Sequence, residues 1–482
     1  MRCVDIMPGY RTDHSMIFLN IQFGKFKKGN SYWKFNNSLL KDTQYVEKIK
    51  SLISNVKLQY ASDRQDIEAP LESISNEFLK FDIDDKLFFE TLLLEIRGET
   101  ISYSSFKKKQ EDKRQEKLLI EINNLEKETD INYPILEAKK EELLQLRNKK
   151  MQGVFIRSRA KWTSEGEKPS KYFCALESRN FISKIIPRLE LDNGELIYEQ
   201  SQILTETSKF YEKLYKNNLG NSYVDLHKEL PYDDIPKLSK DEAESLEGEI
   251  TLNEASRILH NMKSNKSPGS NGFSSEFLKV FWKYIGTFVV RSINHGYRNN
   301  MLSITQRHGV NITLLPKGDK PKQYLKNWRP ITLLNTVYKI ASGCIAARFK
   351  RYLDKIINPD QTGFLPNRYI GENTRLIYDI MHYTEEEDIP GLLLLIDFEK
   401  AFDTVSWNFI EKTLNFFNFG PSIRKWVNLF NTNISSTVNQ GGDLSKTFDI
   451  QRGCRQGDPL APYIFLICSE ILAIQIRKNR KN

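Results

Sequence analysis

A chain of 482 residues with 39% hydrophobic and 28% charged residues has enough apolar content for a buried core, which excludes an intrinsically disordered protein. Lys and Arg outnumber Asp and Glu by 71 to 62, a net charge of +9. This excess favours a polyanionic partner, although a basic soluble protein without such a partner fits it equally well. The five cysteines are scattered and show no CxxC spacing, which argues against a disulfide framework and against a zinc site.

The chain has no recognisable targeting or membrane segment. Its N-terminus lacks the apolar core of a signal peptide. Its strongest apolar run, Leu392 to Ile396, is far shorter than the roughly 20 residues of a membrane span. We therefore expect an intracellular protein, nuclear or cytoplasmic, in a reducing compartment and without a membrane partner. No pattern in the sequence specifies its oligomeric state.

The N-terminal region predicts little regular structure. Residues 1 to about 20 predict one strand, in which Met16 to Leu19 follow a turn at Pro8-Gly9. A single strand cannot bury itself, so its sheet has to be completed from elsewhere. Between residues 21 and 97 the apolar positions show no clear period, and we expect only short helices there.

Residues 103 to 159 are rich in Lys, Glu, Gln and Leu and predict a charged helical hairpin. Two apolar stripes have helical spacing. The segment from Thr129 to Pro134 separates them, because proline disfavours helix at and before its own position. The hairpin lies either against the rest of the protein or along nucleic acid, or else it is a solvated coiled coil without a partner. The stripes consist of Leu118, Ile122 and Leu125, and of Leu136, Leu143 and Leu146.

Two capping boxes predict helix starts further along the chain. They pair Ser239 with Glu242 and Thr251 with Glu254. In each pair the hydroxyl can accept a hydrogen bond from the backbone amide three residues further on, and the glutamate can accept one from the backbone amide of the capping residue. The helix after Thr251 has an apolar face, and a break at residues 266 to 272 precedes a further helix rich in aromatic residues.

The segment TLLPKGDKPKQYLKNWRPITLLNTVYKI, residues 313 to 340, predicts two apolar strands joined by a basic loop. Such a hairpin can present Lys317 and Arg329 to a triphosphate. A charged hairpin loop is also commonly no more than a solvated turn, so this pattern alone does not decide between the two.

The stretch GLLLLIDFEKAFDTVSW, residues 391 to 407, predicts a strand followed by a helix. Its apolar run, Leu392 to Ile396, is typical of a strand buried on both faces, and this strand would place Asp397 at its end. A carboxylate at the mouth of a buried strand is well placed to hold a divalent cation. An aspartate in this position is often only a helix N-cap or a surface residue, and the pattern leaves both interpretations open.

The stretch IQRGCRQGDPLAPYIFLICSEILA, residues 450 to 473, predicts a turn and a buried helix. Asp458 and Pro459 are typical of a helix start, and the helix is apolar nearly all round, which indicates burial. The turn before it, Arg452 to Gly457, places cations and an amide beside a helix N-terminus, a favourable position for phosphate or a base. An ordinary glycine-rich turn is the alternative.

In order and spacing, these three segments resemble the reverse-transcriptase series of the non-LTR (LINE-type) retrotransposon family. Between the first two lies QTGFLPNRYIGENT, residues 361 to 374, which is part of the same series. KSPGSNGFSSEFLK, residues 266 to 279, looks like the segment that precedes the fingers, with Asn271 where the family usually has Asp. Residues 159 to 180 resemble a linker element of these proteins, and residues 12 to 21 resemble the last motif of their apurinic-type endonuclease domain.

The resemblance implies an RNA-directed DNA polymerase that acts on an RNA template, a DNA primer and deoxynucleoside triphosphates (dNTPs). It implies phosphoryl transfer assisted by two Mg²⁺ ions. Asp397 would be the catalytic carboxylate and would bind Mg²⁺ together with the Phe398 carbonyl, whereas Asp13 and His14 would be a remnant of the endonuclease site. The nucleotide-binding residues would be Lys317, Arg329, Phe402, Gln456 and Gly457, and the template-binding residues Gln361, Arg368 and Asn373.

A two-ion site needs several converging carboxylates, which the family supplies from an aromatic-x-Asp-Asp hairpin after the buried helix. No such pair follows Asp458. The two upstream pairs, Asp84-Asp85 and Asp233-Asp234, are predicted to lie in surface turns. We therefore expect a truncated chain that is inactive by itself. A non-catalytic nucleic-acid-binding protein and a poorly folded product of a decayed element are the alternatives.

The expected fold is α+β and helix-rich, with right-hand polymerase fingers and a partial palm preceded by a helical, coiled-coil-like linker region. We expect the endonuclease remnant over residues 1–20, the linker region over 21–240 and the fingers with an incomplete palm over 241–482. The charged hairpin at about 103–159 belongs to the linker region.

Overall fold

The chain divides into two compact units, as seen in a computed structural model of the protein. The first unit consists of residues 1–30, 95–186 and 441–443, and the second of residues 31–94, 187–440 and 444–482. The structure describes residues 3–7, 16–20, 29, 32–62, 79–127, 132–158, 185–217, 226–230, 234–308 and 310–478. Asp13, His14, Asp233 and the linker element at 159–180 lie outside the described residues.

The first unit begins with a two-stranded antiparallel hairpin. β1 (Cys3–Met7) pairs with β2 (Met16–Asn20) in a register that places Cys3 opposite Asn20. The prediction of a single strand over residues 1 to 20 is therefore wrong. The physical reason is local: the segment from Cys3 to Met7 contains a second set of β-prone residues that pairs with the first.

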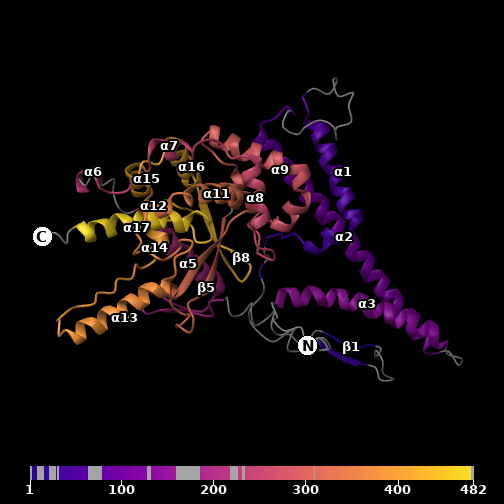
Figure 1. Ribbon diagram of the computed structural model, residues 1–482. Coiled ribbons are helices and arrows are strands. Elements are labelled where there is room, and N and C mark those ends of the chain that lie inside the picture. The colour runs from indigo at the N-terminus through magenta and orange to yellow at the C-terminus, as the bar shows by residue number, and fades with distance from the viewer. Residues whose placement is uncertain are drawn as a thin grey trace. The chain divides into compact units, whose positions relative to one another are not determined.

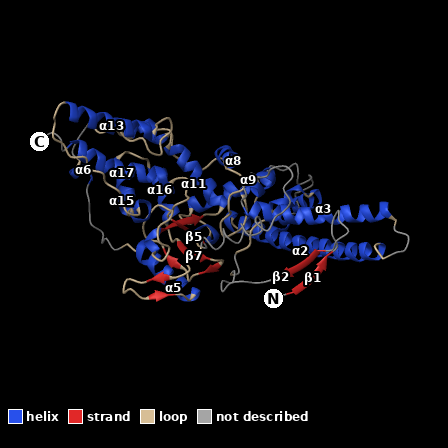
Figure 2. Ribbon diagram, turned by 90° about the horizontal axis from the view of Figure 1, so that it is seen from below, coloured by secondary structure: helices blue, strands red, loops and turns tan. Residues whose placement is uncertain are grey.

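α2 (Asp85–Leu125) and α3 (Tyr133–Ser158) form the predicted charged helical hairpin (Figure 2). Ion pairs flank its core, among them Arg114 with Glu142 at 2.6 Å. Ion pairs that water screens contribute little to stability, so the apolar contacts set how the two helices pack. These contacts join the two predicted stripes through Leu118, Ile122, Leu136 and Leu143, with Leu119, Leu125 and Leu146 partly buried against them.

The second unit opens with η1 (Asn37–Lys41) and α1 (Thr43–Tyr60). The expectation of short helices only before residue 97 is wrong, since α1 is 18 residues long and α2 already begins at Asp85. The tertiary packing of α1 explains why the sequence-based expectation failed. One face of this helix buries Tyr45, Ile49, Ile53 and Val56, a helical spacing that the many polar residues between them obscure in the sequence.

Asp85 is the first residue of α2 and is half-buried, so the prediction of a surface turn is wrong for it, whereas the exposed Asp84 directly precedes the helix. The Asp84 carboxylate accepts a hydrogen bond from the Leu87 amide at 2.8 Å, and Asp85 forms an ion pair with Arg291 at 2.5 Å. Carboxylates are stabilised at the first turn of a helix, where amides lack partners within the helix.

Both predicted capping boxes are present, at the starts of α7 and α8. No helix among the described residues combines the length and the apolar character that crossing a membrane requires. The other helices of this unit are α5 (Gln200–Tyr215), α6 (Leu226–Glu229), α7 (Lys240–Glu244), α8 (Leu252–Asn261), α9 (Ser275–Arg298), α10 (Ile304–Arg307), η2 (Leu325–Asn327), α11 (Thr336–Phe349), α12 (Leu353–Ile356), α13 (Ile370–Glu386), α14 (Ala401–Thr404), α15 (Trp407–Phe416), α16 (Pro421–Asn431) and α17 (Ala461–Lys478).

A five-stranded mixed sheet lies among these helices (Figure 1). β5 (Val310–Pro316) pairs antiparallel with β6 (Trp328–Leu333) and parallel with β7 (Ser435–Gln440). β8 (Asp443–Leu444) and β9 (Phe448–Asp449) both pair with β7. A separate two-stranded hairpin joins β3 (Leu189–Glu190) to β4 (Leu196–Ile197). The α+β, helix-rich class is confirmed.

α9 and α11 form the centre of the hydrophobic core. Phe277, Phe281 and Phe288 of α9 are fully buried. α11 is buried almost all round, and near its end the buried Arg348 donates to both carboxylate oxygens of Glu254, at 2.8 and 2.9 Å. Burial by itself would raise the pKa of Glu254, but the hydrogen bonds from Arg348 and Thr251 outweigh it and lower that pKa. Arg348 thereby connects the second capping box to the hydrophobic core.

α13 projects from the other helices of this unit, and the segment after it returns toward α14 (Figures 1 and 2). No residue of α13 is buried, and apolar side chains such as those of Leu376, Ile380 and Tyr383 are exposed along it. The returning segment, residues 389–396, is also exposed and contains no helix or strand.

Candidate nucleotide-binding site

Three segments that are far apart in the sequence meet in the second unit: the end of β6, the loop at 397–405 and the turn at 452–457. The Thr332 amide of β6 donates to the Gln456 carbonyl at 2.9 Å. The Cys454 amide donates to the Phe402 carbonyl at 2.5 Å, and the Gly453 amide donates to the Val405 carbonyl at 2.8 Å. Because backbone groups make these bonds, they hold the three segments together whichever side chains project from them.

Two glycines allow this close approach. Gly453 has a φ of +92°, and a Cβ there would lie 2.7 Å from the Asp403 carbonyl oxygen. Gly457 has a φ of +105°, and a Cβ there would lie 2.8 Å from the Thr332 carbonyl oxygen. Both positions therefore require a residue without a Cβ, for conformation and for space.

The predicted strand–basic loop–strand hairpin is present as β5 and β6. Lys317 follows the last residue of β5, and its amide donates to the Asn327 carbonyl at 2.9 Å. Side chains alternate along β6, so Trp328 and Pro330 are buried while Arg329 between them is exposed. Alternation of this kind follows from the period of two in a strand, and it turns the guanidinium of Arg329 to solvent.

The prediction of a buried strand over Leu392 to Ile396 is wrong. Leu392 is 92% exposed and Ile396 is 62% exposed, and neither belongs to a strand. Within the described ranges no strand pairs with this segment. An isolated strand can neither satisfy its backbone nor bury both faces, so the apolar run remains extended in solvent. Asp397 at its end is exposed as well.

The residues after Asp397 are held by aromatic contacts. The Phe402 ring lies with its centroid 6.1 Å from that of Phe364 and 5.0 Å from that of Phe465. Phe398 also contacts Phe465, at 6.2 Å. Phe364 belongs to the 361–374 motif, so a fourth predicted segment reaches the same place.

The predicted template residues make contacts within their own loop. Arg368 donates to the carbonyls of Asn358 and Gln361, at 2.6 and 2.8 Å, and Asn373 donates to the Asp360 carbonyl at 2.9 Å. Arg368 and Asn373 thus fold residues 358–373 into a compact turn. Gln361, at the centre of this turn, is half-buried.

A buried network supports the 452–457 turn. Arg455 donates to the Tyr338 hydroxyl and to the Phe430 carbonyl, and Tyr338 donates to the Asp458 carboxylate at 2.8 Å. α17 begins at Ala461, and besides the bond from Tyr338 the Asp458 carboxylate accepts from the nearby Leu460 amide. The predicted helix start at Asp458 and Pro459 is therefore too early, because Asp458 is bonded to Tyr338 of α11. Sequence reasoning missed this network, since no local pattern links residues so far apart.

Sequence reasoning also did not place Asp403 in the site. It is 1% exposed, and it accepts a hydrogen bond from the Tyr215 hydroxyl at 2.8 Å. Burial raises its pKa from 3.8 to about 6, against the opposing effects of Tyr215, Lys400 and Lys317. The charges of Lys317 and Lys400 therefore act close to the loop that carries Asp397.

The described residues do not fit a site for two metal ions. No group of three or more His, Cys, Asp or Glu side chains converges among them in an arrangement that could hold a metal ion. Asp397 is exposed, whereas the Asp403 carboxylate is buried against Tyr215. The exposed Glu399 lies two residues further along the same segment, and two carboxylates without a third converging ligand do not hold two dications.

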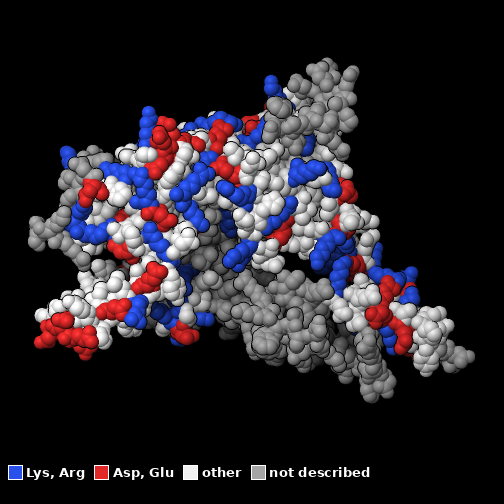
Figure 3. Space-filling model, in the orientation of Figure 1, with Lys and Arg blue, Asp and Glu red and all other residues white. Residues whose placement is uncertain are grey.

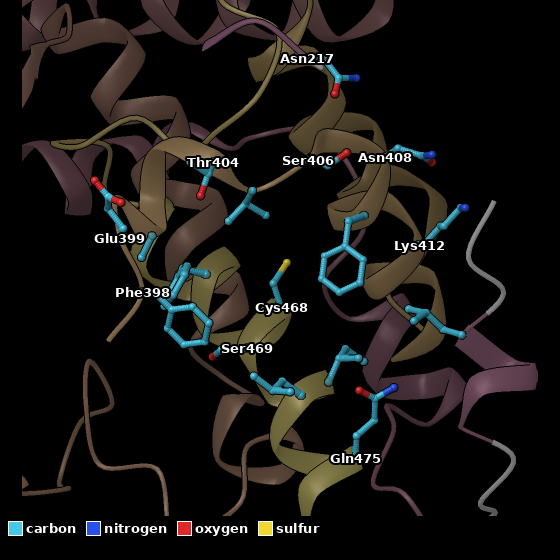
Figure 4. Close-up of a pocket in the computed structure, with 17 residues that line it drawn as sticks. Asn217, Phe398, Glu399, Thr404, Ser406, Asn408, Lys412, Cys468, Ser469 and Gln475 are labelled. Carbon is cyan, nitrogen blue, oxygen red and sulfur yellow. The ribbon is translucent and has the colours of Figure 1, made fainter. Parts of the chain in front are cut away.

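A cavity of about 500 Å³ lies behind the 397–405 loop, between α14, α15 and α17 (Figure 4). Phe398, Val405, Phe409 and Leu472 give it a largely apolar lining. Lys412 is the only Lys or Arg among its described lining residues. A triphosphate needs several cationic partners, so this cavity is not the nucleotide site.

Basic and acidic side chains are mixed over the face shown in Figure 3. Acidic residues gather at the far end of α13, where Glu385, Glu386, Glu387 and Asp388 follow one another (Figure 3). Their charge opposes the approach of phosphates.

Comparisons with known proteins show which family this part of the chain is similar to. Residues 315–481 match the family described as "Reverse transcriptase (RNA-dependent DNA polymerase)", and this range contains the Lys317 loop, the 397–405 loop and the 452–457 turn. The chain therefore carries a reverse transcriptase domain. Members of this family use divalent metal ions and act on nucleic acid templates with dNTPs.

Relatives extend the similarity beyond that domain. The chain is 28% identical over 475 residues to the Transposon TX1 uncharacterized 149 kDa protein of Xenopus laevis, which covers 97% of this chain and 34% of that protein. It is 27% identical over 164 residues to the Pol polyprotein of the type-1 retrotransposable element R2 of Popillia japonica, covering 33% and 23% of the two chains. It is 24% identical over 237 residues to that of element R1 of Bradysia coprophila, covering 48% and 23%. These relatives are transposon and retrotransposon proteins, and the chain spans about a third or less of their length.

Proposed function

We propose that the second unit forms the fingers and part of the palm of an RNA-directed DNA polymerase, and that it binds an incoming dNTP between β6 and the 397–405 loop. The observation that supports this proposal is the meeting of separate motifs at the 452–457 turn. Backbone hydrogen bonds join this turn both to β6, through Thr332, and to the loop, through Phe402 and Val405.

In this site the cations would bind the triphosphate. Arg329 is exposed on β6, and Lys317 lies at the end of β5, close enough to act on Lys400 and Asp403. A guanidinium can donate two hydrogen bonds to phosphate oxygens, while an ammonium acts as a point charge. We propose that Lys317 and Arg329 carry most of the charge-dependent affinity.

The sugar and base would contact the other two segments. Phe402 is half-buried between Phe364 and Phe465, and a ring held in this way excludes a 2′-hydroxyl by its volume. Gln456 and Gly457 would lie against the nucleotide and the template. Gln361, Arg368 and Asn373 would line the template strand through the compact turn that they form.

We further propose that Asp397 and the Phe398 carbonyl are ligands of Mg²⁺, and that this chain by itself binds its ligands without polymerising. The exposed carboxylates that the described residues supply at this place are those of Asp397 and Glu399, which do not suffice for two ions. A nucleic-acid-binding function without catalysis is accordingly the second candidate for these 482 residues, and the net charge of +9 supports it.

The two candidates differ in nucleotide binding. Lysine-selective chemical modification, read out by mass spectrometry, should show that a dNTP protects Lys317, whereas Lys320 in the same loop stays reactive. Lys317→Ala should weaken dNTP binding, and the matched Lys320→Ala should not. Equal reactivity of Lys317 with and without dNTP would leave nucleic-acid binding as the better proposal.

Catalysis is tested separately by primer extension on an RNA template with Mg²⁺ and all four dNTPs. We expect no extension by the purified chain. Extension that Asp397→Ala abolishes would contradict the proposed inactivity. In either case RNA binding should fall steeply as salt is raised, because released counterions provide much of the binding free energy.

A further inference from the structure

α5 (Gln200–Tyr215) lies outside residues 315–481. The C-terminal end of this helix nevertheless contacts the 452–457 turn and Gln451, the residue that precedes the turn. The Gln451 amide donates to the Tyr215 carbonyl at 3.0 Å, and Nε of Arg452 donates to the Leu214 carbonyl at 2.8 Å. The last carbonyls of a helix have no partner within the helix. Here the segment at 451–452 provides those partners, so the end of α5 and this segment are fixed to each other.

The same helix also holds the loop that carries Asp397. Tyr215 donates its hydroxyl to Asp403 at 2.8 Å in a fully buried contact, and the ammonium of Lys400 lies 4.2 Å from the centre of the Phe210 ring. In the sequence, Lys400 precedes Phe402 and Asp403 follows it. Lys400 adopts a left-handed conformation with φ +53°, which a non-glycine residue rarely adopts. Contacts on both sides of Phe402 therefore restrain this short segment.

A buried carboxylate without a donor is costly. Burial raises the pKa of Asp403 to about 6, and the hydrogen bond from Tyr215 opposes that rise. The carboxylate faces Tyr215 and Tyr211 from α5, Lys400 from its own loop, Lys317 from the end of β5 and Cys454 from the turn. Among these groups Tyr215 donates a hydrogen bond to the carboxylate, so the orientation of the Asp403 side chain depends on this hydroxyl.

We propose that Tyr215 is a positioning residue of the polymerase site. By holding Asp403, it fixes the 397–405 loop, and with it Asp397 and Phe402, against the 452–457 turn. This inference deepens the proposed nucleotide site and rests on it. It assigns a role at the site to a helix outside the matched reverse transcriptase range. Tyr215 touches no ligand in this role and acts only through Asp403.

The chain offers a matched control for the test. Tyr211 lies one turn earlier in α5 and is equally buried, but its hydroxyl has no hydrogen-bond partner among the described residues. Tyr215→Phe and Tyr211→Phe thus remove the same atom from neighbouring buried rings, and only the first removes a donor to Asp403. Asp403→Asn in the Tyr215→Phe background replaces the buried charge by a neutral amide, which costs less to leave without a donor.

Two measurements on the 482-residue chain are needed. Hydrogen exchange of peptides that cover residues 398–405 should become about 10- to 100-fold faster in Tyr215→Phe at pH 7.5, as expected for loss of a hydrogen bond to a buried charge. It should be unchanged in Tyr211→Phe and largely restored by adding Asp403→Asn. Binding of dTTP with Mg²⁺, measured by calorimetry, should weaken about tenfold in Tyr215→Phe alone.

The outcomes separate this inference from the proposed function. Equal exchange in Tyr215→Phe and Tyr211→Phe overturns the inference whether or not dTTP binds. Faster exchange with unchanged dTTP affinity also overturns it, since the contact is then only structural. Absence of dTTP binding in the unsubstituted chain means that the proposed nucleotide site has failed. In that case exchange by itself decides whether Tyr215 holds the loop.

Discussion

Replacement of Gly453 by alanine tests the backbone contact that joins the 397–405 loop to the 452–457 turn. At a φ of +92°, an L-residue is expected to cost about 1–2 kcal/mol of stability from conformation alone. The added Cβ would lie 2.7 Å from the Asp403 carbonyl oxygen. Relief of that contact by shifting the backbone should add about 1–3 kcal/mol. We therefore expect Gly453→Ala to lower the free energy of unfolding by about 2–5 kcal/mol.

Gly194→Ala separates the two contributions. Gly194 has a similar φ of +83°, and a Cβ there would meet nothing within 4 Å, so this variant should lose only the conformational part, about 1–2 kcal/mol. Urea unfolding followed by circular dichroism gives both values, provided that the m-values agree. If Gly453→Ala is no less stable than Gly194→Ala, the close approach of the turn to Asp403 is not present in solution, and the geometry of the site has to be revised.

Three other measurements bear on the site and its support. Because burial raises the pKa of Asp403 from 3.8 to about 6, the unfolded chain loses the Asp403 proton at a lower pH than the folded chain does. The free energy of unfolding should therefore fall by about 3 kcal/mol as pH rises from about 4 to about 6. Asp403→Asn should gain stability relative to the unsubstituted chain over this range, and parallel pH profiles of urea unfolding would contradict the burial of this carboxylate. Arg348→Met leaves the half-buried Glu254 with Thr251 as its remaining donor and should cost about 2–3 kcal/mol, the loss expected for hydrogen bonds to a charged group. Adding Glu254→Gln should recover part of that loss, as a double-mutant cycle in urea would show. Lys317→Ala should weaken dTTP binding about tenfold, the loss expected for one charge-assisted contact; calorimetry that finds the same affinity as in Lys320→Ala would remove Lys317 from the site.

Local patterns were sufficient wherever neighbouring residues decide the structure. The capping boxes at Ser239 and Thr251 depend on groups three residues apart, and both are present. The β5–β6 hairpin around Lys317 and the stripes of the α2–α3 hairpin likewise follow from short-range spacing. The roles of the individual site residues are still predictions.

Distant contacts account for the errors. The run from Leu392 to Ile396 has the composition of a buried strand, but a strand exists only beside a partner, and none of the described strands pairs with it. Asp458 and Pro459 have the pattern of a helix start, but the hydrogen bond from Tyr338 engages Asp458, and the helix begins at Ala461.

The sequence by itself determined the similarity to reverse transcriptases, the order of the motifs and the residue types that reach the candidate site, because each of these is contained in a short run of neighbouring residues. The tertiary structure alone decided which motifs touch, that Asp403 is buried against Tyr215 across 188 positions of the chain, and that the apolar run before Asp397 is exposed. Burial and pairing depend on which surfaces meet when the chain folds. Side chains brought together in this way leave no periodic signal in the sequence for a local pattern to detect.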